Sequence, residues 1–532
     1  MSRACCRPIR RRLAWLAPVL WVSLLAPVWL ASPAQAWSGF LDPTFGDDGK
    51  QVTDFGGGDR DGARAIVIAP DGTLLVAGQG VSVFGLARYL PDGTLDATFG
   101  SGGTVTTYMG TASEAKALAL QDDGRIVVAG IATEHLAQRF GVVRYEADGR
   151  LDTTFGSRGR VITDFPGQSD IAAAVAIQTD GKIVVAGSTT GVSGDFAVAR
   201  YEPDGSLDAS FGDGGKVVTD LAGTSDSGWA VAIQADGRIL VGGAAYSDLP
   251  GDFALVRYQT DGSLDQTFDL DGKVLTDFGG TADSAFAMVL QPDGRIVLGG
   301  ASGETNDDFA LARYNPDGSL DQTFSGDGKT VTDFYGGSDW IRGLALQPDG
   351  RIVAAGRLGS FALTRYDDRG RLEGTFGVAG KVVTGFGIGQ ANGYGVAVQE
   401  DGAIVVVGDT DNGSSQWDFA LARYVGSGFD LPQCTILGTS GDDVLLGTAG
   451  PDVICGRAGD DEIYGLDGDD ILLGDKGHDY LKADGGSDLL FGGADADTLD
   501  SRDLLGGNDA SYGQSGTDSC VKDDGDLTRS CP

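Results

Sequence analysis

Histidine is the scarcest of the chemically versatile residues in this 532-residue chain, which contains only His135 and His478. The chain has no histidine-containing zinc motif, serine-centred hydrolase motif, phosphate-binding loop or dinucleotide-binding fingerprint. A hydrolase that works with carboxylates alone remains the alternative. However, each acidic candidate belongs to a repeat and none is singular. We therefore expect a protein that is not an enzyme.

Basic residues are also few, with 39 Lys and Arg against 76 Asp and Glu and a formal net charge of −37. A charge of this sign and size argues against nucleic acid or an anionic membrane as a partner. It is consistent with binding of multivalent cations.

Long apolar runs are missing beyond the first 36 residues. Five arginines precede the apolar stretch Leu13–Leu30, and the small-residue sequence Ala34-Gln35-Ala36 follows it. This order is typical of a secretory signal peptide. A retained membrane anchor is less favoured, because Pro18 and Pro27 interrupt the stretch. We expect cleavage before Trp37, a secreted, extracellular protein, and no membrane span in the mature chain.

Cysteine is sparse, and only four of the six cysteines follow the signal peptide: Cys434, Cys455, Cys520 and Cys531. An even number in a secreted chain indicates disulfides, and four cysteines allow three connectivities. We favour Cys434–Cys455 and Cys520–Cys531. A metal-thiolate site is the less favoured alternative, because no Cys-x-x-Cys spacing is present after the signal peptide.

A unit of about 56 residues dominates the chain and recurs seven times, which is typical of a solenoid, a propeller or an array. Its first element, Leu-Asp-x-Thr/Ser-Phe, begins at Leu41, Leu95, Leu151, Leu207, Leu264, Leu320 and, with Glu as its second residue, Leu372. An Arg-Tyr pair closes each unit at Arg88, Arg144, Arg200, Arg257, Arg313, Arg365 and Arg423. An Asp-Gly pair lies between these two markers in every unit, where it predicts a hairpin turn.

Each unit predicts four short strands, as at Lys216–Asp220, Trp229–Gln234, Arg238–Gly242 and Phe253–Tyr258. Four strands per repeat are typical of a β-propeller blade. With 87 glycines and no convincing amphipathic helix, we predict an all-β, seven-bladed β-propeller over residues 37–430.

The two ends of the propeller are expected to complete one blade together. The chain enters with an outer strand, Lys50–Phe55, and leaves with a third strand, Phe419–Tyr424. Pairing of these two strands would close the ring and leave no free sheet edge.

Repeated charges in the units have two possible roles. The Arg of each closing pair is matched by an acidic residue of the next unit, such as Asp208 for Arg200, which predicts a structural ion pair rather than a binding surface. Five aspartates share one place in the loop that leads to the next unit: Asp61, Asp170, Asp226, Asp283 and Asp339. They form either an acidic ring that attracts cations or, as we favour, turn caps.

The connections between the second and third strands vary freely among the units. Binding residues concentrate on variable loops carried by a rigid scaffold. The face with these connections is therefore our candidate for recognising an extracellular protein or glycan ligand. This region, residues 41–424, resembles the delta-60 repeat family of bacterial β-propellers in its LD-x-TFG, GKV-x-TDFG, QPDGKIVVAG and DFALARY elements. The resemblance implies the propeller fold and no catalytic residues.

From Gly438 the period changes to that of a nonapeptide, with Gly at positions 1 and 4, Asp at position 6 and an aliphatic residue at position 8. Position 6 is Asp in seven consecutive registers: Asp443, Asp452, Asp461, Asp470, Asp479, Asp488 and Asp497. Ser501–Asp503 interrupts the period, which resumes weakly at Asp509 and Asp518. The region resembles the RTX (hemolysin-type) calcium-binding repeats of secreted bacterial proteins.

Two nonapeptides are expected to form one coil of a parallel β-roll over residues 431–532, so that aspartates of every second nonapeptide stack on one side. Carboxylate and carbonyl oxygens between stacked turns would form a cage that favours Ca²⁺, so we predict the seven aspartates as metal ligands. From Gly438 onward there are 22 acidic and 6 basic residues, so folding is expected to require Ca²⁺. Ala483 and Asp495 replace turn glycines, which predicts weaker sites near them. Together these features predict a secreted, calcium-binding adhesion-type protein.

Overall fold

The computed structural model describes residues 38–42, 44–47, 49–56, 61–167, 169–190, 194–221, 225–246, 251–279, 282–303, 306–334, 336–377, 379–387, 389–411, 416–426, 434–503, 509–515, 517–523 and 526–529. Every regular element in these ranges is a β-strand, as predicted. Within them, no helix is long and apolar enough to cross a bilayer. The predicted signal peptide lies outside the described residues, and so does the predicted boundary at 430/431.

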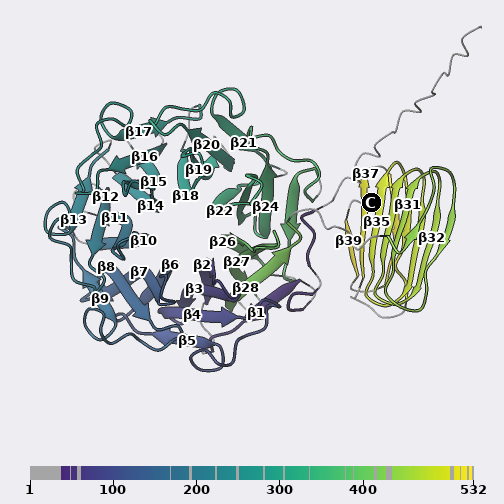
Figure 1. Cartoon of the computed structure of the whole chain (residues 1–532), viewed down its shortest axis with the longest axis horizontal. Helices are drawn as coiled ribbons and strands as arrows, with labels where there is room; N and C mark the ends of the chain where they lie inside the picture. The colour runs from purple at the N-terminus through teal and green to yellow at the C-terminus, as the bar shows by residue number, and fades with distance from the viewer. Residues whose placement is uncertain are drawn as a thin grey trace, which may run out of the picture. The chain divides into compact units, whose positions relative to one another are not determined.

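Seven four-stranded antiparallel sheets form the blades of a ring (Figure 1). Two of them are joined by one extra parallel pair, Gly194 with Ser225. The inner strands are β2 (Gly62–Ile68), β6 (Ser113–Leu120), β10 (Ser169–Ile177), β14 (Ser225–Ile233), β18 (Ser284–Leu290), β22 (Trp340–Leu346) and β26 (Ala391–Val398). The second strands are β3 (Leu74–Gly80), β7 (Ile126–Glu134), β11 (Ile183–Thr190), β15 (Ile239–Tyr246), β19 (Ile296–Ser302), β23 (Ile352–Arg357) and β27 (Ile404–Asp411).

The outer half of each blade holds one long and one short strand. The third strands are β4 (Val83–Tyr89), β8 (Ala137–Tyr145), β12 (Gly194–Tyr201), β16 (Asp252–Tyr258), β20 (Asp308–Tyr314), β24 (Phe361–Tyr366) and β28 (Trp417–Tyr424). The outermost strands are β5 (Thr104–Thr107), β9 (Arg160–Thr163), β13 (Lys216–Thr219), β17 (Lys273–Thr276), β21 (Lys329–Thr332), β25 (Lys381–Thr384) and β1 (Lys50–Thr53).

The predicted closure of the ring is confirmed. Strand β1 pairs antiparallel with β28, with Lys50 opposite Ala422 and Thr53 opposite Phe419. The last blade packs against the first, because Val405 and Leu421 lie in one apolar cluster with Val76. Equivalent clusters lie between all the other neighbouring blades, so the core of the propeller is a set of blade-to-blade interfaces.

The repeated Arg serves the blade, as predicted. Arg313 is 1% exposed, and its Nε donates to Asp321 Oδ2 at 2.9 Å. Its Nη1 donates to the Asp368 carbonyl oxygen of the next blade at 2.6 Å, and its guanidinium carbon lies 4.6 Å from the centre of the Phe324 ring. The Arg of each repeat therefore ties two blades together, a role that its spacing in the sequence did not indicate.

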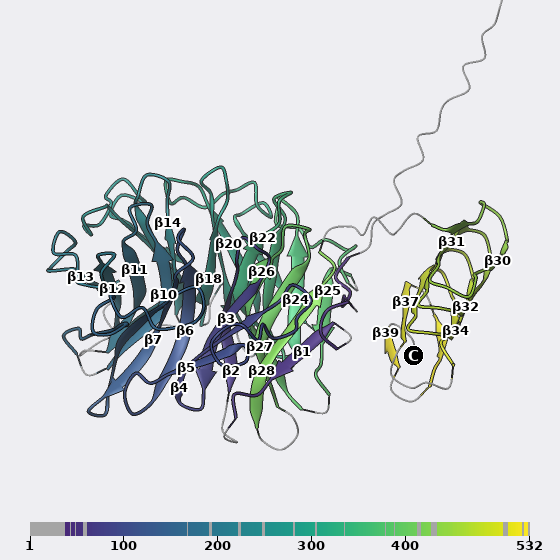
Figure 2. The ribbon, with the colours of Figure 1, turned by 60° about the horizontal axis from the view of Figure 1, so that its bottom comes forward.

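Two parallel sheets form the roll, whose coils are visible in Figure 2. One sheet contains β29 (Ile436–Leu437), β31 (Val453–Ala458), β33 (Ile471–Lys476), β35 (Leu489–Ala494), β37 (Ala510–Ser515) and β39 (Leu527–Arg529). The other contains β30 (Val444–Leu446), β32 (Glu462–Asp467), β34 (Tyr480–Gly485), β36 (Thr498–Asp500) and β38 (Ser519–Val521). Position 8 of the nonapeptides points inward as predicted, since Ile454, Leu472 and Leu490 form its buried core.

The roll advances by two nonapeptides per coil until the interruption. Ile454 pairs with Leu472 and Leu472 with Leu490. Leu490 then pairs with Ser511, a longer step, because the inserted segment Ser501–Asp503 lengthens that coil. The parallel stack continues past the interruption, so the weakly resumed period still forms strands.

Some boundaries differ from those predicted. Strand β15 continues to Tyr246, beyond the predicted end at Gly242. Strand β14 begins at Ser225, before the predicted start at Trp229. Small residues such as Ala244 and Gly228 hide the period-2 alternation, which is why the apolar pattern underestimates both strands.

Candidate calcium and ligand sites

The aspartates at position 6 stack along the roll. The backbone N–H of Asp443 donates to Asp461 Oδ1 at 2.8 Å, and the N–H of Asp461 donates to Asp479 Oδ1 at 2.9 Å. The same bond joins Asp452 to Asp470, Asp470 to Asp488, and Asp479 to Asp497. It continues past the interruption from Asp488 to Asp509 and from Asp497 to Asp518. The predicted stacking of every second nonapeptide is therefore present, while the role of these residues as metal ligands stays a prediction.

The second oxygen of most of these carboxylates is buried without a hydrogen-bond partner among the described residues. This holds for Oδ2 of Asp461, Asp470, Asp479, Asp488, Asp497, Asp509 and Asp518. A buried carboxylate oxygen without a partner is costly. A row of such oxygens is chemically suited to act as ligands of cations.

The glycine at position 1 makes room for this oxygen. A Cβ on Gly465 would lie 2.5 Å from Asp470 Oδ2 and 2.7 Å from the carbonyl oxygen of Ala483. A Cβ on Gly474 would lie 2.3 Å from Asp479 Oδ2 and 2.4 Å from another carbonyl oxygen. Carboxylate and carbonyl oxygens thus converge on the bare side of each glycine. This all-oxygen donor set suits Ca²⁺.

The first two nonapeptides differ from the rest. Asp443 Oδ2 accepts hydrogen bonds from the N–H and hydroxyl of Thr439, at 2.6 and 2.8 Å. Thr448 makes the same two bonds to Asp452 Oδ2. Of the seven predicted ligands, Asp443 and Asp452 therefore have their second oxygen already satisfied by the chain.

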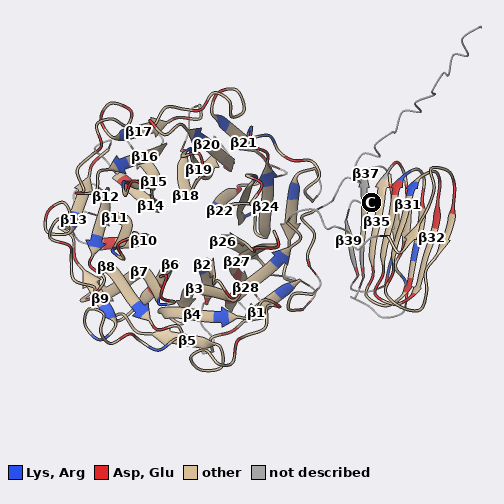
Figure 3. Cartoon of the chain, in the orientation of Figure 1, with Lys and Arg blue, Asp and Glu red and all other residues tan. Residues whose placement is uncertain are grey.

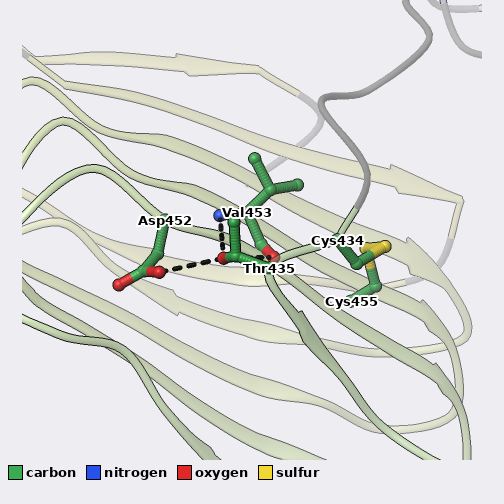
Figure 4. Close-up of a disulfide and its surroundings, with 5 residues drawn as sticks. All are labelled: Cys434, Thr435, Asp452, Val453 and Cys455. Atoms are coloured by element: carbon green, nitrogen blue, oxygen red, sulfur yellow. Dashed lines mark hydrogen bonds between the residues drawn. A yellow bond between two sulfur atoms is a disulfide. The ribbon is translucent and has the colours of Figure 1, made fainter.

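A disulfide and a threonine cover the start of the roll (Figure 4). Cys434 and Cys455 are bonded, as predicted. The Thr435 hydroxyl donates to Asp452 Oδ1 at 2.9 Å, so it replaces the backbone N–H that an earlier coil would supply. Cys520 is also disulfide-bonded. Because Cys531 lies outside the described residues, the pair Cys520–Cys531 stays a prediction.

Burial raises the pKa of four stacked carboxyls in the middle of the roll, and the carboxylate in the preceding coil raises it further. The pKa reaches about 6 for Asp470 and Asp479, and about 7 for Asp488 and Asp497. Without cations, these groups therefore take up protons at a higher pH than an ordinary aspartate does.

Positive φ angles occur at positions 2 and 4 of the stacked nonapeptides, not at position 1. Leu466 has a φ of 76° and Asp475 one of 74°, whereas Gly465 and Gly474 are not in this region. Glycine at position 1 is thus required for space rather than for its backbone angle. Asp495, which replaces a position-4 glycine, adopts a φ of 81°. Ala483 occupies position 1 before Asp488, where its side chain takes the space that glycine leaves free elsewhere.

Replacing Leu466 with glycine is expected to stabilise the roll by about 0.5–1 kcal/mol. A left-handed residue with a Cβ costs about 1–2 kcal/mol, part of which the greater freedom of glycine in the unfolded chain cancels. The Leu466 side chain is 40% exposed, so little packing is lost. Leu446→Gly is the control, because Leu446 is 58% exposed and has no positive φ. Thermal unfolding at fixed calcium measures both variants, and an equal loss of stability in both would contradict this account.

The five loop aspartates of the propeller are buried turn caps. Oδ2 of Asp170 accepts the N–H of Phe165 at 3.0 Å, and Oδ2 of Asp339 accepts that of Phe334 at 2.8 Å. Asp61, Asp226 and Asp283 make the same bond. This geometry agrees with the capping role that we favoured over a cation-attracting ring.

A ring of side chains that the sequence did not single out lies on the inner strands. Each inner strand has a β-bulge at the same place. The extra residue is different in almost every blade, and we call this set the bulge ring: Arg64, Lys116, Ala173, Trp229, Phe286, Arg342 and Tyr394. The inner strands surround the centre of the propeller (Figure 1), so the bulge ring lines its inner edge. Bulges often re-aim side chains at functional sites.

The bulge ring combines cations with aromatic faces. The Arg342 guanidinium carbon lies 4.0 Å from the centre of the Phe286 ring, and that of Arg64 lies 4.2 Å from the Tyr394 ring. Arg342 Nε is buried and has no hydrogen-bond partner among the described residues. Burial, together with Arg357 and Arg64, lowers the pKa of Arg342 to about 10. Arg64 pairs with Glu114 and Asp409, and Lys116 pairs with Glu114, so Arg342 is the cation of the bulge ring that has no acidic partner among the described residues. Acidic residues are frequent on the loops of the blades (Figure 3).

Neither histidine forms a catalytic arrangement. His135 lies at the tip of a hairpin with a φ of 50°. His478 is exposed, and its Nδ1 lies 3.0 Å from the carbonyl oxygen of Ala496, in the neighbouring coil. Both histidines are exposed.

Two family models match the chain. The β-propeller domain of unknown function DUF5122 matches residues 69–99, 121–155, 178–211, 234–268, 291–324 and 399–428. The RTX calcium-binding nonapeptide repeat matches residues 437–472 and 464–499. These matches confirm the predicted order of a repeat propeller followed by RTX repeats.

Solved structures with similar folds are only distantly related. A protein of unknown function from Dyadobacter fermentans DSM 18053 is 13% identical, with a TM-score of 0.40 over 61% of this chain and 98% of that chain. The polysaccharide lyase Uly1 is 12% identical, with a TM-score of 0.42 over 74% of this chain and 97% of that chain. At such low similarity these structures carry no argument about activity. No curated protein matches the chain at a significant level.

Proposed function

We propose, starting from the match of the C-terminal repeats to the RTX calcium-binding nonapeptide, that this chain is a secreted, non-enzymatic binding protein whose roll folds around Ca²⁺. The observation that carries the proposal is the row of buried Oδ2 atoms without partners, beginning at Asp461. The excess of acidic residues in the roll also supports folding around Ca²⁺, because like charges destabilise a compact metal-free state.

The aspartates from Asp461 to Asp497 would hold the ions, each with a carbonyl oxygen of a neighbouring turn. Bound Ca²⁺ supplies positive charge that the roll itself lacks. Asp443 and Asp452 would contribute less, because Thr439 and Thr448 already satisfy their second oxygens. Extracellular calcium sites typically bind in the range of about 10⁻⁴–10⁻³ M, which suits folding that begins only after export.

Replacing Gly465 with alanine is expected to remove about one bound calcium ion per chain, because the new Cβ would lie 2.5 Å from Asp470 Oδ2. Gly450→Ala is the matched control, since a Cβ there would have no neighbour within 4 Å. Ala483→Gly is expected to have the opposite effect and to strengthen binding beside Asp488. Equilibrium dialysis of the full-length protein at millimolar calcium counts the ions. Equal counts for wild type and Gly465→Ala would refute the proposed role of the glycine.

The propeller is proposed to bind an anionic ligand, such as an acidic glycan, at the bulge ring. Arg342 offers a charge that no described carboxylate neutralises, while Trp229 and Phe286 offer flat faces, with their ring centres 5.9 Å apart. Aromatic faces next to cations suit sugar rings that carry carboxylate or sulfate groups. The bulges lie near the start of the inner strands, at the same end as the variable connections. This agrees with the recognition face expected from the sequence.

An array of neutral and acidic glycans, probed with and without calcium, tests the propeller's role. Arg342→Gln is expected to reduce acidic-glycan binding, by about tenfold if one charged contact is lost. Arg351→Gln is the control, because Arg351 pairs with Asp349 at an exposed turn at the opposite end of the same blade. Binding to neutral glycans alone would contradict the ligand class, and cleavage of a bound glycan would favour the hydrolase alternative.

A further inference from the structure

Four blades of the propeller each gather three carboxylates at the same end. In each group one oxygen per residue lies within 4.8 Å of the others. We call these groups the carboxylate triads: Asp54, Asp61 and Asp418; Asp195, Asp220 and Asp226; Asp252, Asp277 and Asp283; Asp308, Asp333 and Asp339. They lie outside the roll and are separate from the proposed RTX sites.

Three separate segments build each triad. In the last of the four, Asp308 opens the third strand β20, Asp333 follows the outer strand β21, and Asp339 precedes the next inner strand, β22. Because strand pairing places Phe309 opposite Thr332, the residues before and after this pair meet at one end of the blade. The convergence thus comes from the register of the sheet and not from sequence proximity.

Asp339 supplies an acceptor that the chain leaves unused. Its side chain is fully buried, and its Oδ2 accepts the N–H of Phe334. Its Oδ1 is buried and has no hydrogen-bond partner among the described residues. Burial, with the nearby carboxylates of Asp308 and Asp333, raises the pKa of Asp339 to about 7. A buried carboxylate oxygen without a hydrogen-bond partner, close to two further carboxylates, is costly unless a cation compensates it.

The local charge favours a divalent ion. Lys381 Nζ donates to the Asp333 carbonyl oxygen at 2.6 Å, so one ammonium group flanks the triad. Three carboxylates and one ammonium leave two negative charges, which one divalent cation would balance. Because the three oxygens lie within 4.8 Å of one another, small shifts of the side chains suffice to bring all three to the calcium–oxygen distance of about 2.3–2.6 Å.

The remaining blades support this interpretation. At the position of Asp308, the second blade has Arg139, whose Nε lies 2.9 Å from Asp164 Oδ1 and whose Nη1 lies 3.8 Å from Asp170 Oδ2. Here the chain supplies its own cation to the two remaining carboxylates. Two other blades lack all three acids, with Val83, Tyr108 and Ser113 in one and Ser360, Gly385 and Ala391 in the other. The triad positions therefore vary as a set, as the ligands of one ion would.

We propose that the carboxylate triads are divalent-cation sites of the propeller that take Ca²⁺, with Asp308, Asp333 and Asp339 as the ligands of the best-defined site. Each bound ion would join an outer strand to the inner strand of the next blade. This inference does not depend on calcium binding by the roll.

Asp308→Arg tests the proposal, because it copies the arrangement around Arg139. The variant is expected to bind about one calcium ion fewer per chain in equilibrium dialysis, and in chelator to unfold at the same temperature as wild type or higher. Asp293→Arg is the charge-matched control, at an exposed turn at the opposite end of the same blade. An unchanged ion count in Asp308→Arg would overturn the proposal, and so would an equal loss in both variants.

Terbium luminescence separates these sites from those of the roll. The segment 431–532 contains no tryptophan, whereas Trp340 directly follows Asp339 and Trp417 directly precedes Asp418. Excitation of tryptophan is expected to give Tb³⁺ emission that excess Ca²⁺ abolishes and that Asp308→Arg weakens. Asp308→Ser, which copies Ser360, should weaken it as well. Tb³⁺ emission absent in wild type, or unchanged in both variants, would refute cation binding at this triad.

Discussion

Metal-free protein is expected to lose the parallel strands of its C-terminal repeats at neutral pH and to regain them near about pH 5. Burial and carboxylates in neighbouring coils raise the pKa of Asp488 and Asp497 to about 7, and that of Asp470 and Asp479 to about 6. In the unfolded chain these groups titrate near the ordinary value of 3.8. Between these values the folded roll binds more protons than the unfolded chain, so the free energy of unfolding falls as pH rises.

With calcium bound, the pH dependence of the free energy of unfolding is expected to have the opposite sign. A bound ion requires the ionised carboxylates, so calcium-loaded roll should gain stability as pH rises through the same window, where metal-free roll loses it. A tenfold change in proton affinity corresponds to about 1.4 kcal/mol, so four such groups together outweigh the stability of a small roll. The propeller is expected to change less. Against the effect of burial, hydrogen bonds from Thr323 and the charge of Arg313 lower the pKa of Asp321, which opposes the raised pKa of loop aspartates such as Asp339.

Hydrogen exchange of the full-length protein, corrected for intrinsic rates at each pH, resolves the two regions. Peptides covering β32–β35 should exchange fast in chelator at about pH 7.5 and slowly at about pH 5. Asp488→Asn with Asp497→Asn should flatten this pH dependence while reducing calcium uptake. Slower exchange of the metal-free roll at about pH 7.5 than at about pH 5 would contradict the expected titration.

Removing one buried guanidinium of the propeller is expected to be the most damaging single substitution there. Arg313→Ala leaves Asp321, which is 4% exposed, with only the longer contact to Arg295, whose Nε lies 3.4 Å from Asp321 Oδ2, and it frees the carbonyl oxygen of Asp368. Loss of one partner of a buried ion pair typically costs about 3–5 kcal/mol. Arg313→Lys should cost less than Arg313→Ala, because it keeps the charge but not the two-pronged geometry.

Arg88→Ala is the matched control for this substitution. Arg88 occupies the same repeat position, but its side chain is 18% exposed and that of its partner Asp96 is 11% exposed. Water can therefore solvate Asp96 when the guanidinium is gone, and the loss should be smaller. Denaturant unfolding in saturating calcium, followed by tryptophan fluorescence, compares the two. Equal losses would show that burial does not set the energy of this pair.

Repetition explains why much of the fold could be predicted. Because the motif recurs seven times, the strands of a blade, its turns and its closing Arg-Tyr pair could be recognised from the sequence. The unmatched outer strand at Lys50 was enough to predict the pairing of β1 with β28. The nonapeptide period likewise predicted the stacking of Asp443 on Asp461.

The sites were harder to predict because they depend on register. Trp229 was expected to begin a strand, but it is the extra residue of a bulge within one. Bulges do not change the apolar pattern enough to be seen in a single sequence. The triad residues Asp308 and Asp333 meet only because Phe309 pairs with Thr332. Glycine is needed at position 1 for space and not for a positive φ. This could be recognised only from the atomic positions of Gly465 and its neighbours.

The pairing of β1 with β28 has a consequence for biogenesis. Lys50 pairs with Ala422, so the first strand of the propeller to be synthesised, β1, cannot pair until the last one, β28, is available. Contacts this distant in sequence slow folding, and until they form the last blade exposes an unpaired sheet edge. A chain truncated anywhere before β28 cannot seal the ring. Closure of the ring is therefore a late step of folding, which cannot occur before β28 has been synthesised.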